Sequence, residues 1–236
     1  MNLLKHIQAL SNNVINLFFP SVCVSCHRLL LDNETLLCHH CQSDLPFTYF
    51  NLDDDNPVYK RLSTIVNIEA ASSLLLFDKA DVVKELIHHL KYRGRQDVGQ
   101  FLGEIFSQNL KNNPVVSQID YIVPAPLHPK KQRKRGYNQL TVFGQTLAKH
   151  LQIQYRADIL LKTVNNTSQT TKTAEQRRQN VAGVYTVNKP ENYANKHFLV
   201  IDDVMTTGAT IEACAETLLQ QIPNAKVSVL TMAVVL

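Results

Sequence analysis

Apolar and polar residues follow one another along this chain in blocks that predict strands and helices in turn. Short apolar runs typical of buried strands occur at residues 72–77, 119–123, 181–187, 198–201 and 227–235. Apolar residues recur every three or four positions, as on one face of a helix, at residues 80–92, 97–110, 137–151 and 211–219. Strands that alternate with helices predict an α/β fold with a mostly parallel sheet flanked by helices.

Two segments depart from this alternation. Residues 1–19 carry Leu, Ile, Val and Phe at helical spacing, which predicts an N-terminal amphipathic helix over residues 1–20 that ends at Pro20. Its polar face has only Lys5 as a formal cation, so we expect it to pack against its own domain and not on a membrane. Residues 162–180 are polar and threonine-rich, which is typical of a loop or lid.

Two cysteine pairs with Cys-x2-Cys spacing stand near the N-terminus, Cys23 with Cys26 and Cys38 with Cys41. Four thiolates in two such knuckles can meet at one tetrahedral Zn²⁺, and a site closed by four sulfurs is structural and not catalytic. Disulfides and an iron–sulfur cluster are the alternatives. A reducing cytoplasm opposes the first, and nothing else in the chain indicates redox chemistry. The sequence therefore predicts a zinc-ribbon module with four cysteine ligands over residues 21–57.

The composition is that of a globular protein, with 44% hydrophobic and 19% charged residues in a chain of 236. No apolar run approaches the roughly 18–20 residues that cross a bilayer, and the N-terminus lacks the pattern of a secretory signal. We therefore expect a cytoplasmic protein with no membrane insertion. Its net charge of +4 permits anionic ligands without requiring nucleic acid.

The most informative stretch is FLVIDDVMTTGAT, residues 198–210. An apolar strand pattern leads to Asp202 and Asp203, and a small polar loop then opens a helix. Free N–H groups and the positive dipole end at a helix N-terminus suit phosphate, and two carboxylates can accept hydrogen bonds from the vicinal hydroxyls of a ribose. The stretch therefore predicts a site for a ribose 5-phosphate. The two carboxylates stand where the strand is expected to end, and because neighbouring strand residues point to opposite faces, both can serve one ligand only if the chain leaves strand geometry at about Asp203.

The basic run at residues 130–135 and the single residue Lys91 could reach the same site. Five cations at residues 130–135 follow a proline-rich segment that ends a predicted strand. In open α/β sheets ligands bind at the carboxyl ends of strands, where this basic run and the Asp pair are both expected. The run suits pyrophosphate or a nucleic-acid backbone, and a solvated basic turn is the alternative. Lys91 either faces the same pocket or only stabilises the C-terminus of its helix.

These features give the chain a resemblance to known protein families. Residues 198–210 resemble the phosphoribosyl diphosphate (PRPP) motif of type I phosphoribosyltransferases, and nearly the whole chain resembles the ComF family of competence proteins, also called ComF/GntX. The resemblance is carried by the two cysteine pairs and by LFFP at 17–20, LKYRG at 90–94, VPAPLHPKKQRKRGYNQL at 123–140, TSQTTKTAEQRRQNV at 167–181 and IDDVMTTGAT at 201–210. It implies a type I phosphoribosyltransferase fold over residues 58–236 and a role with incoming single-stranded DNA in natural transformation.

The resemblance also implies a ligand site. Asp202 and Asp203 would hold the ribose hydroxyls of PRPP, and Mg²⁺ would bridge ribose and pyrophosphate oxygens. The residues implied around the 5-phosphate are Thr206, Thr207, Gly208, Ala209 and Thr210. The residues implied at the pyrophosphate loop, or as cations that compensate its charge, are Pro124, Ala125, Pro126, Lys91, Arg133 and Arg135. The chain departs from well-characterised phosphoribosyltransferases at this loop, where Pro-Ala-Pro replaces a small residue, a basic residue and glycine.

Two functions are consistent with these features. A PRPP-dependent phosphoribosyltransferase would displace pyrophosphate from the anomeric carbon of ribose, and the positive loops and Mg²⁺ would stabilise the departing charge; no residue stands out as its general base. A non-catalytic cytoplasmic protein would instead handle single-stranded DNA through the basic run and the ribbon, beside DNA-uptake machinery. The basic run serves both functions, so it does not discriminate between them.

Overall fold

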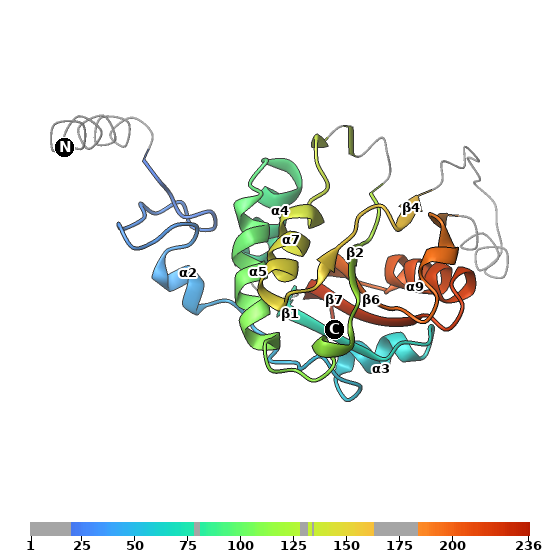
Figure 1. Ribbon diagram of the computed structural model, residues 1–236. Coiled ribbons are helices and arrows are strands. Elements are labelled where there is room, and N and C mark those ends of the chain that lie inside the picture. Colours follow the sequence, from blue (N-terminus) through green and yellow to red (C-terminus); the bar gives the residue numbers. More distant parts are fainter. Residues whose placement is uncertain (1–19, 78–80, 128–131, 134, 163–183) are drawn as a thin grey trace, which may run out of the picture.

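The computed structural model describes residues 20–77, 81–127, 132–133, 135–162 and 184–236, and the structural statements below concern these residues (Figure 1). The predicted helix at 1–19, part of the basic run and the segment 163–183 lie outside them. Within the described part of the chain, no helix is long and apolar enough to cross a membrane.

A five-stranded parallel sheet forms the centre of the molecule (Figure 1). Its strands lie in the order β1-β7-β6-β2-β3, and every neighbouring pair is parallel. They are β1 (Ala70–Leu76), β2 (Tyr121–Pro124), β3 (Gln154–Tyr155), β6 (His197–Met205) and β7 (Lys226–Val234). The long central strands β6 and β7 are buried along almost their whole length, which explains their continuous apolar runs. The predicted mostly parallel sheet is confirmed.

Helices cover both faces of this sheet. On one face α4 (Asp81–Tyr92), α5 (Asp97–Leu110) and α7 (Leu140–Leu151) gather together, and α9 (Ala209–Gln221) covers the other face (Figure 1). The chain leaves β2 into α7 and leaves β6 into α9, so these two adjacent strands feed helices on opposite faces. The space beyond their carboxyl ends is a switch point of the topology, which is where open α/β sheets bind ligands.

A second, smaller sheet stands beside the first. Its two antiparallel strands are β4 (Leu160–Lys162) and β5 (Tyr185–Val187). The sequence predicted a strand at 181–187, and β5 is its described part. This pair packs over α9, where Gln221 Oε1 accepts the backbone N–H of Val187 at 2.8 Å, and it brings Lys162 and Tyr185 toward the end of β6.

One expectation about β6 is wrong. The strand does not end near Asp203 but continues to Met205, with Val204 and Met205 still paired to Ala233 and Val234 of β7. Since side chains alternate along a strand, Asp202 and its neighbour Asp203 start out toward opposite faces of the sheet.

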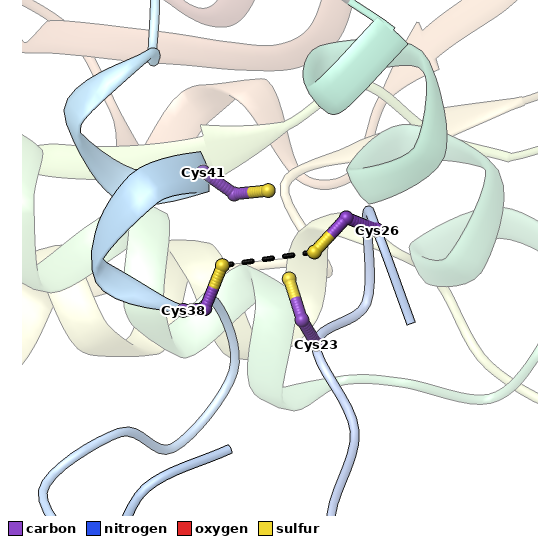
Figure 2. A group of neighbouring side chains, drawn as sticks. All are labelled: Cys23, Cys26, Cys38 and Cys41. Atoms are coloured by element: carbon purple, nitrogen blue, oxygen red, sulfur yellow. Dashed lines mark hydrogen bonds between the residues drawn. The ribbon is translucent and has the colours of Figure 1, made fainter. Parts of the chain in front are cut away.

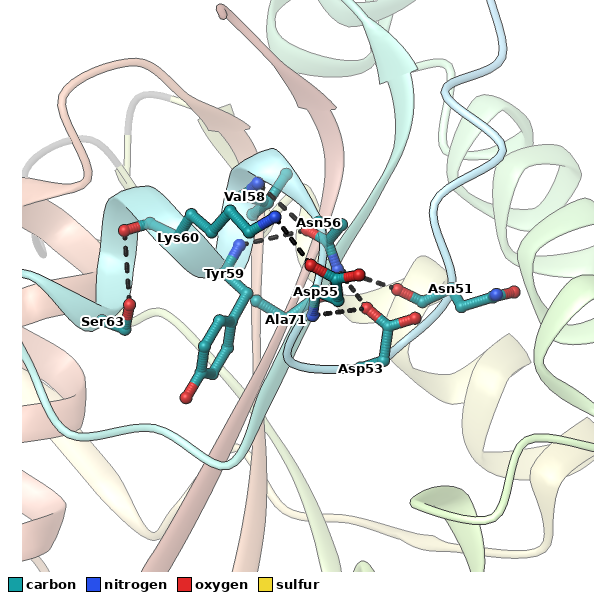
Figure 3. Close-up of polar contacts among 9 residues, drawn as sticks. All are labelled: Asn51, Asp53, Asp55, Asn56, Val58, Tyr59, Lys60, Ser63 and Ala71. Carbon is teal, nitrogen blue, oxygen red and sulfur yellow. Dashed lines mark hydrogen bonds and ion pairs between the residues drawn. The ribbon is translucent and has the colours of Figure 1, made fainter.

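The helix α3 (Pro57–Ser63), which the sequence did not predict, begins at a buried asparagine (Figure 3). Asn56 Oδ1 accepts two N–H groups of the first turn, and its Nδ2 donates to the backbone oxygen of Ala71 in β1 at 2.7 Å. The same Nδ2 donates to Asp53 Oδ1 at 2.9 Å, so Asp53 also belongs to this network. The cap fixes α3 against β1.

The N-terminal module holds the short helix α2 (His39–Ser43) and few other regular elements. A turn at Asp32 and Asn33 is closed by a 2.8 Å hydrogen bond from the N–H of Glu34 to the backbone oxygen of Leu31. Phe47 and Asp53, which lie inside the predicted module, pair with Leu75 and Ala71 of β1 through isolated bridges. The boundary at residue 57 stays a prediction.

Candidate functional site

The loop that follows β6 is shaped by a glycine and by α3. Gly208 has φ +87°, a conformation that side chains disfavour, and a Cβ there would also lie 3.1 Å from Leu62 Cδ2 of α3. Arg61 of α3 donates to the backbone oxygens of Thr206 at 3.0 Å and Val235 at 2.6 Å. Leu62 and Arg61 of α3 thus both hold the loop in place. No sequence pattern had indicated Arg61.

A small cavity opens where this loop enters α9. The helix begins at Ala209, so the N–H groups of its first turn, which have no partner within the helix, border the cavity. The volume is about 50 Å³, lined by Asp202, Val204 and residues 205–211. All five predicted phosphate-binding residues, Thr206 to Thr210, line it. The cavity has the size and the donors that a single phosphate group needs.

The two aspartates have different partners. Asp203 is buried, with 6% of its surface exposed. Its Oδ1 accepts from Lys91 Nζ at 2.7 Å, and its Oδ2 accepts from Gln139 Nε2 at 2.7 Å. Asp202 is less buried, and among the described residues its carboxylate receives one hydrogen bond, from the N–H of Asp203 at 2.8 Å.

Burial, and then the neighbouring charge of Asp203, raise the pKa of Asp202 to about 7. Across β6, Asp202 faces the α9 side, where its charge helps to raise the pKa of the buried Cys214 thiol, after burial itself. Cys214 is fully buried. The site therefore holds one carboxylate with a side-chain donor on each oxygen and one that receives a single backbone hydrogen bond from the described residues.

Two sequence motifs meet beside Asp203. The end of α4 and the segment before α7 are joined by a hydrogen bond from the Tyr137 hydroxyl to the backbone oxygen of Leu90. The Arg135 guanidinium lies over the Tyr92 ring, 5.1 Å from its centroid, and its Nη1 donates to Gln139 Oε1 at 2.7 Å. The motifs LKYRG and RGYNQ are thus interlocked, and together they present their cations to the end of β6.

A larger cavity of about 210 Å³ lies between these motifs and the end of β6. Its lining includes both aspartates and the predicted residues Lys91, Arg135, Ala125, Pro126 and Thr210. Pro124 instead lines an adjoining cavity of about 540 Å³. Arg133 is exposed and lines neither cavity. The structure therefore brings together all the predicted ligand-site residues except Arg133.

Sequence reasoning missed the residues that β4 and β5 bring to this cavity. Lys162 Nζ donates to the Tyr185 hydroxyl at 3.3 Å and lies 5.0 Å from the centre of its ring. Both residues line the 210 Å³ cavity. Neither stood in a recognisable motif, because the contact depends on how the small sheet folds over α9.

The four N-terminal cysteines form the second candidate site (Figure 2). Their four Sγ atoms lie within 4.8 Å of one another, and those of Cys26 and Cys38 are 3.6 Å apart. A tetrahedral zinc with Zn–S bonds of about 2.3 Å places its sulfurs about 3.8 Å apart, so this arrangement fits the metal. Glu34 joins the turn between the two knuckles to the second knuckle, because its carboxylate accepts the N–H groups of Leu31 at 2.8 Å and His39 at 2.6 Å. The four cysteines could hold a metal ion such as zinc.

Comparison with known proteins agrees with this architecture. Residues 141–235, which include β6, its loop and α9, match the family model described as phosphoribosyl transferase domain. DNA utilization protein YhgH of Escherichia coli K12 is 26% identical over 207 residues, which cover 84% of this chain and 84% of that protein. Competence protein ComFC of Bacillus subtilis is 28% identical over 64% of this chain and 60% of its own length.

Among solved structures, adenine phosphoribosyltransferase from Saccharomyces cerevisiae overlaps with 60% of this chain and 72% of its own, at 20% identity and a TM-score of 0.37. The family match and the sheet described above show a type I phosphoribosyltransferase fold preceded by a cluster of four cysteines. Together with the matches to the two curated relatives, they support the similarity of this chain to the ComF family of phosphoribosyltransferase-like proteins.

Proposed function

We propose that this protein binds PRPP together with Mg²⁺ between the carboxyl ends of β2 and β6, and that it serves in DNA uptake during natural transformation. One observation carries the first part. Asp202, Val204 and Thr210 border both the phosphate-sized cavity at α9 and the larger cavity that holds Lys91 and Arg135. PRPP has a phosphate at one end, a diphosphate at the other and a diol between them, and the joined cavities offer matching groups in that order.

Mg²⁺ would be held chiefly by ligand oxygens and water, as is usual for this ion with phosphate ligands. The carboxylate of Asp202 is the protein oxygen best suited to assist, since it borders both cavities and has acceptor capacity to spare. When bound, the ion would neutralise charge on the diphosphate.

The names of the relatives support the role in DNA uptake. One is called a DNA utilization protein and another a competence protein. We also propose that zinc occupies the four-cysteine cluster of a ribbon module at 21–57, that residues 58–236 form the PRPP-binding domain and that the protein works in the cytoplasm.

Isothermal titration of PRPP, with and without Mg²⁺, tests the ligand. We expect binding that requires Mg²⁺ and that weakens at least about tenfold in Asp202→Asn, because charge-assisted hydrogen bonds to the diol are lost. Lys149→Gln is the control for charge, since Lys149 is exposed on α7 and lines neither cavity. Folded wild-type protein that takes up no PRPP would refute the proposal.

The second candidate function is non-catalytic handling of single-stranded DNA. It is favoured by the exposure of Tyr92, at 63%, with Arg135 stacked on its ring, because aromatic and guanidinium faces are platforms for nucleobases. Salt-dependent binding of an oligonucleotide, weakened by Tyr92→Ala and by Arg133→Gln but not by Lys149→Gln, would support it. Release of pyrophosphate from bound PRPP on addition of nucleobases or amines would instead indicate a transferase.

A further inference from the structure

We infer that Asp203 is a positioning residue, which holds Lys91 and, through Gln139, Arg135 in place to receive a diphosphate, while Asp202 alone accepts the ribose hydroxyls. This inference rests on the proposed function, because it assigns different roles in PRPP binding to two adjacent carboxylates of the same cavity. It changes the role that the PRPP motif implies for Asp203.

The first support is that both oxygens of Asp203 already have donors. Lys91 Nζ and Gln139 Nε2 each lie 2.7 Å from one of them. The side chain of Asp203 is 9% exposed and that of Lys91 is 21% exposed, so water screens this ion pair only weakly. A ribose hydroxyl would have to share an oxygen that already accepts a hydrogen bond, and the bond from Lys91 is charge-assisted and therefore roughly twice as strong as a neutral one.

The second support is the orientation of Gln139. This residue is 6% exposed, and its amide has a different partner at each end. Nε2 donates to the carboxylate of Asp203, and Oε1 accepts from Arg135 Nη1 at 2.7 Å. An amide turned the other way would place an oxygen against the carboxylate and an N–H group against the guanidinium. Asp203 therefore fixes the amide of Gln139, and the amide in turn fixes Arg135.

The third support is that the two cations so held come from two separate elements. Lys91 belongs to the last turn of α4, and Arg135 precedes α7. Both line the 210 Å³ cavity together with Ala125 and Pro126 of the segment after β2. The Pro-Ala-Pro segment has no basic side chain and Pro124 and Pro126 have no N–H. Cations held by Asp203 would supply the charge that this segment lacks.

The carboxylate of Asp202, in contrast to that of Asp203, has few donors within the described part of the protein. Asp202 borders both the phosphate-sized cavity and the larger one, and among the described residues its carboxylate receives only the N–H of Asp203. It is therefore the carboxylate with more acceptor capacity available to a diol.

The test compares three probes on the full-length protein by isothermal titration: PRPP with Mg²⁺, inorganic pyrophosphate with Mg²⁺, and ribose 5-phosphate. In Asp203→Asn we expect affinity for pyrophosphate to fall about tenfold and affinity for ribose 5-phosphate to change less than about twofold. In Asp202→Asn we expect affinity for ribose 5-phosphate, which is titrated without Mg²⁺, to fall about tenfold. Gln139→Leu, which changes no charge, should reproduce the loss for pyrophosphate if the amide links Asp203 to Arg135.

The sign of the change separates the alternatives. If Asp203 were only a nearby anion, its removal would strengthen pyrophosphate binding; if it were a ribose ligand, its removal would weaken ribose 5-phosphate binding. Either result overturns the inference. Unchanged pyrophosphate binding in Gln139→Leu also overturns it, and this second variant keeps the inference testable even if Asp203→Asn fails to fold. Wild-type protein that binds PRPP leaves the proposed function standing in each of these cases, whereas wild type that binds none of the three probes refutes both.

Discussion

The pair formed by Lys91 and Asp203 links α4 to the end of β6, so its removal should be costly for stability. In Lys91→Met the hydrophobic stem is kept, but Asp203, only 6% exposed, loses its cation and keeps Gln139 as its remaining side-chain donor. Breaking a fully buried pair costs about 3–5 kcal/mol. Because the side chain of Lys91 is 21% exposed, we discount this range and expect a loss of about 2–4 kcal/mol in the free energy of unfolding.

Urea denaturation monitored by circular dichroism measures this loss. The double variant Lys91→Met/Asp203→Asn should recover at least about 1 kcal/mol of it, because the unpaired carboxylate is then gone. The control is Lys196→Met, which breaks a 2.8 Å pair with Asp120 whose side chains are 40% and 31% exposed, and which should cost no more than about 1 kcal/mol. A cost for Lys91→Met that does not exceed the control, or strictly additive effects in the double variant, would refute the reasoning.

Three further predictions concern other parts of the site. The pKa of Asp202, raised to about 7 by burial and by its acidic neighbour, means that the folded protein holds an extra proton below that value. PRPP affinity should therefore fall about tenfold per unit as pH drops below 7, while ligand-free stability should decrease as pH rises from about 4 toward 7; both trends should vanish in Asp202→Asn. Zinc measured by mass spectrometry should be about one ion per chain and be lost in Cys41→Ser, but kept in Cys214→Ala, whose sulfur lies outside the cluster. Gly208→Ala should lower the melting temperature more than Gly94→Ala, since both have positive φ but only at Gly208 does the new methyl group press on α3.

The parallel sheet could be predicted because its long central strands have a clear apolar pattern in the sequence. β6 and β7 are buried on both faces, so they read as unbroken apolar runs, and α5 was predicted with its observed ends. The helix α3 was missed because it is only seven residues long and is fixed by the buried side chain of Asn56, which no periodicity reveals. The extension of β6 to Met205 was missed because hydrogen bonds to β7 outweigh the local preference of acidic residues for a turn.

The candidate site was predictable where it is local in sequence. The loop at 206–210 and the cysteine pairs each depend on a few neighbouring residues, and the structure places them together. Gln139, Lys162 and Arg61 depend on contacts across at least 23 positions of the chain, so no local pattern could assign them. The different environments of the two aspartates follow from the alternation of side chains along β6, which became evident only once the strand was seen to continue past them.

A crystal structure of the protein with PRPP and Mg²⁺ would show directly whether the ligand binds as proposed. We expect the 5-phosphate at the N-terminus of α9, the ribose hydroxyls against Asp202, and the diphosphate beside Lys91 and Arg135, with Asp203 still bonded to Gln139. A ligand bound in the reverse direction, or a diphosphate that contacts neither cation, would contradict it.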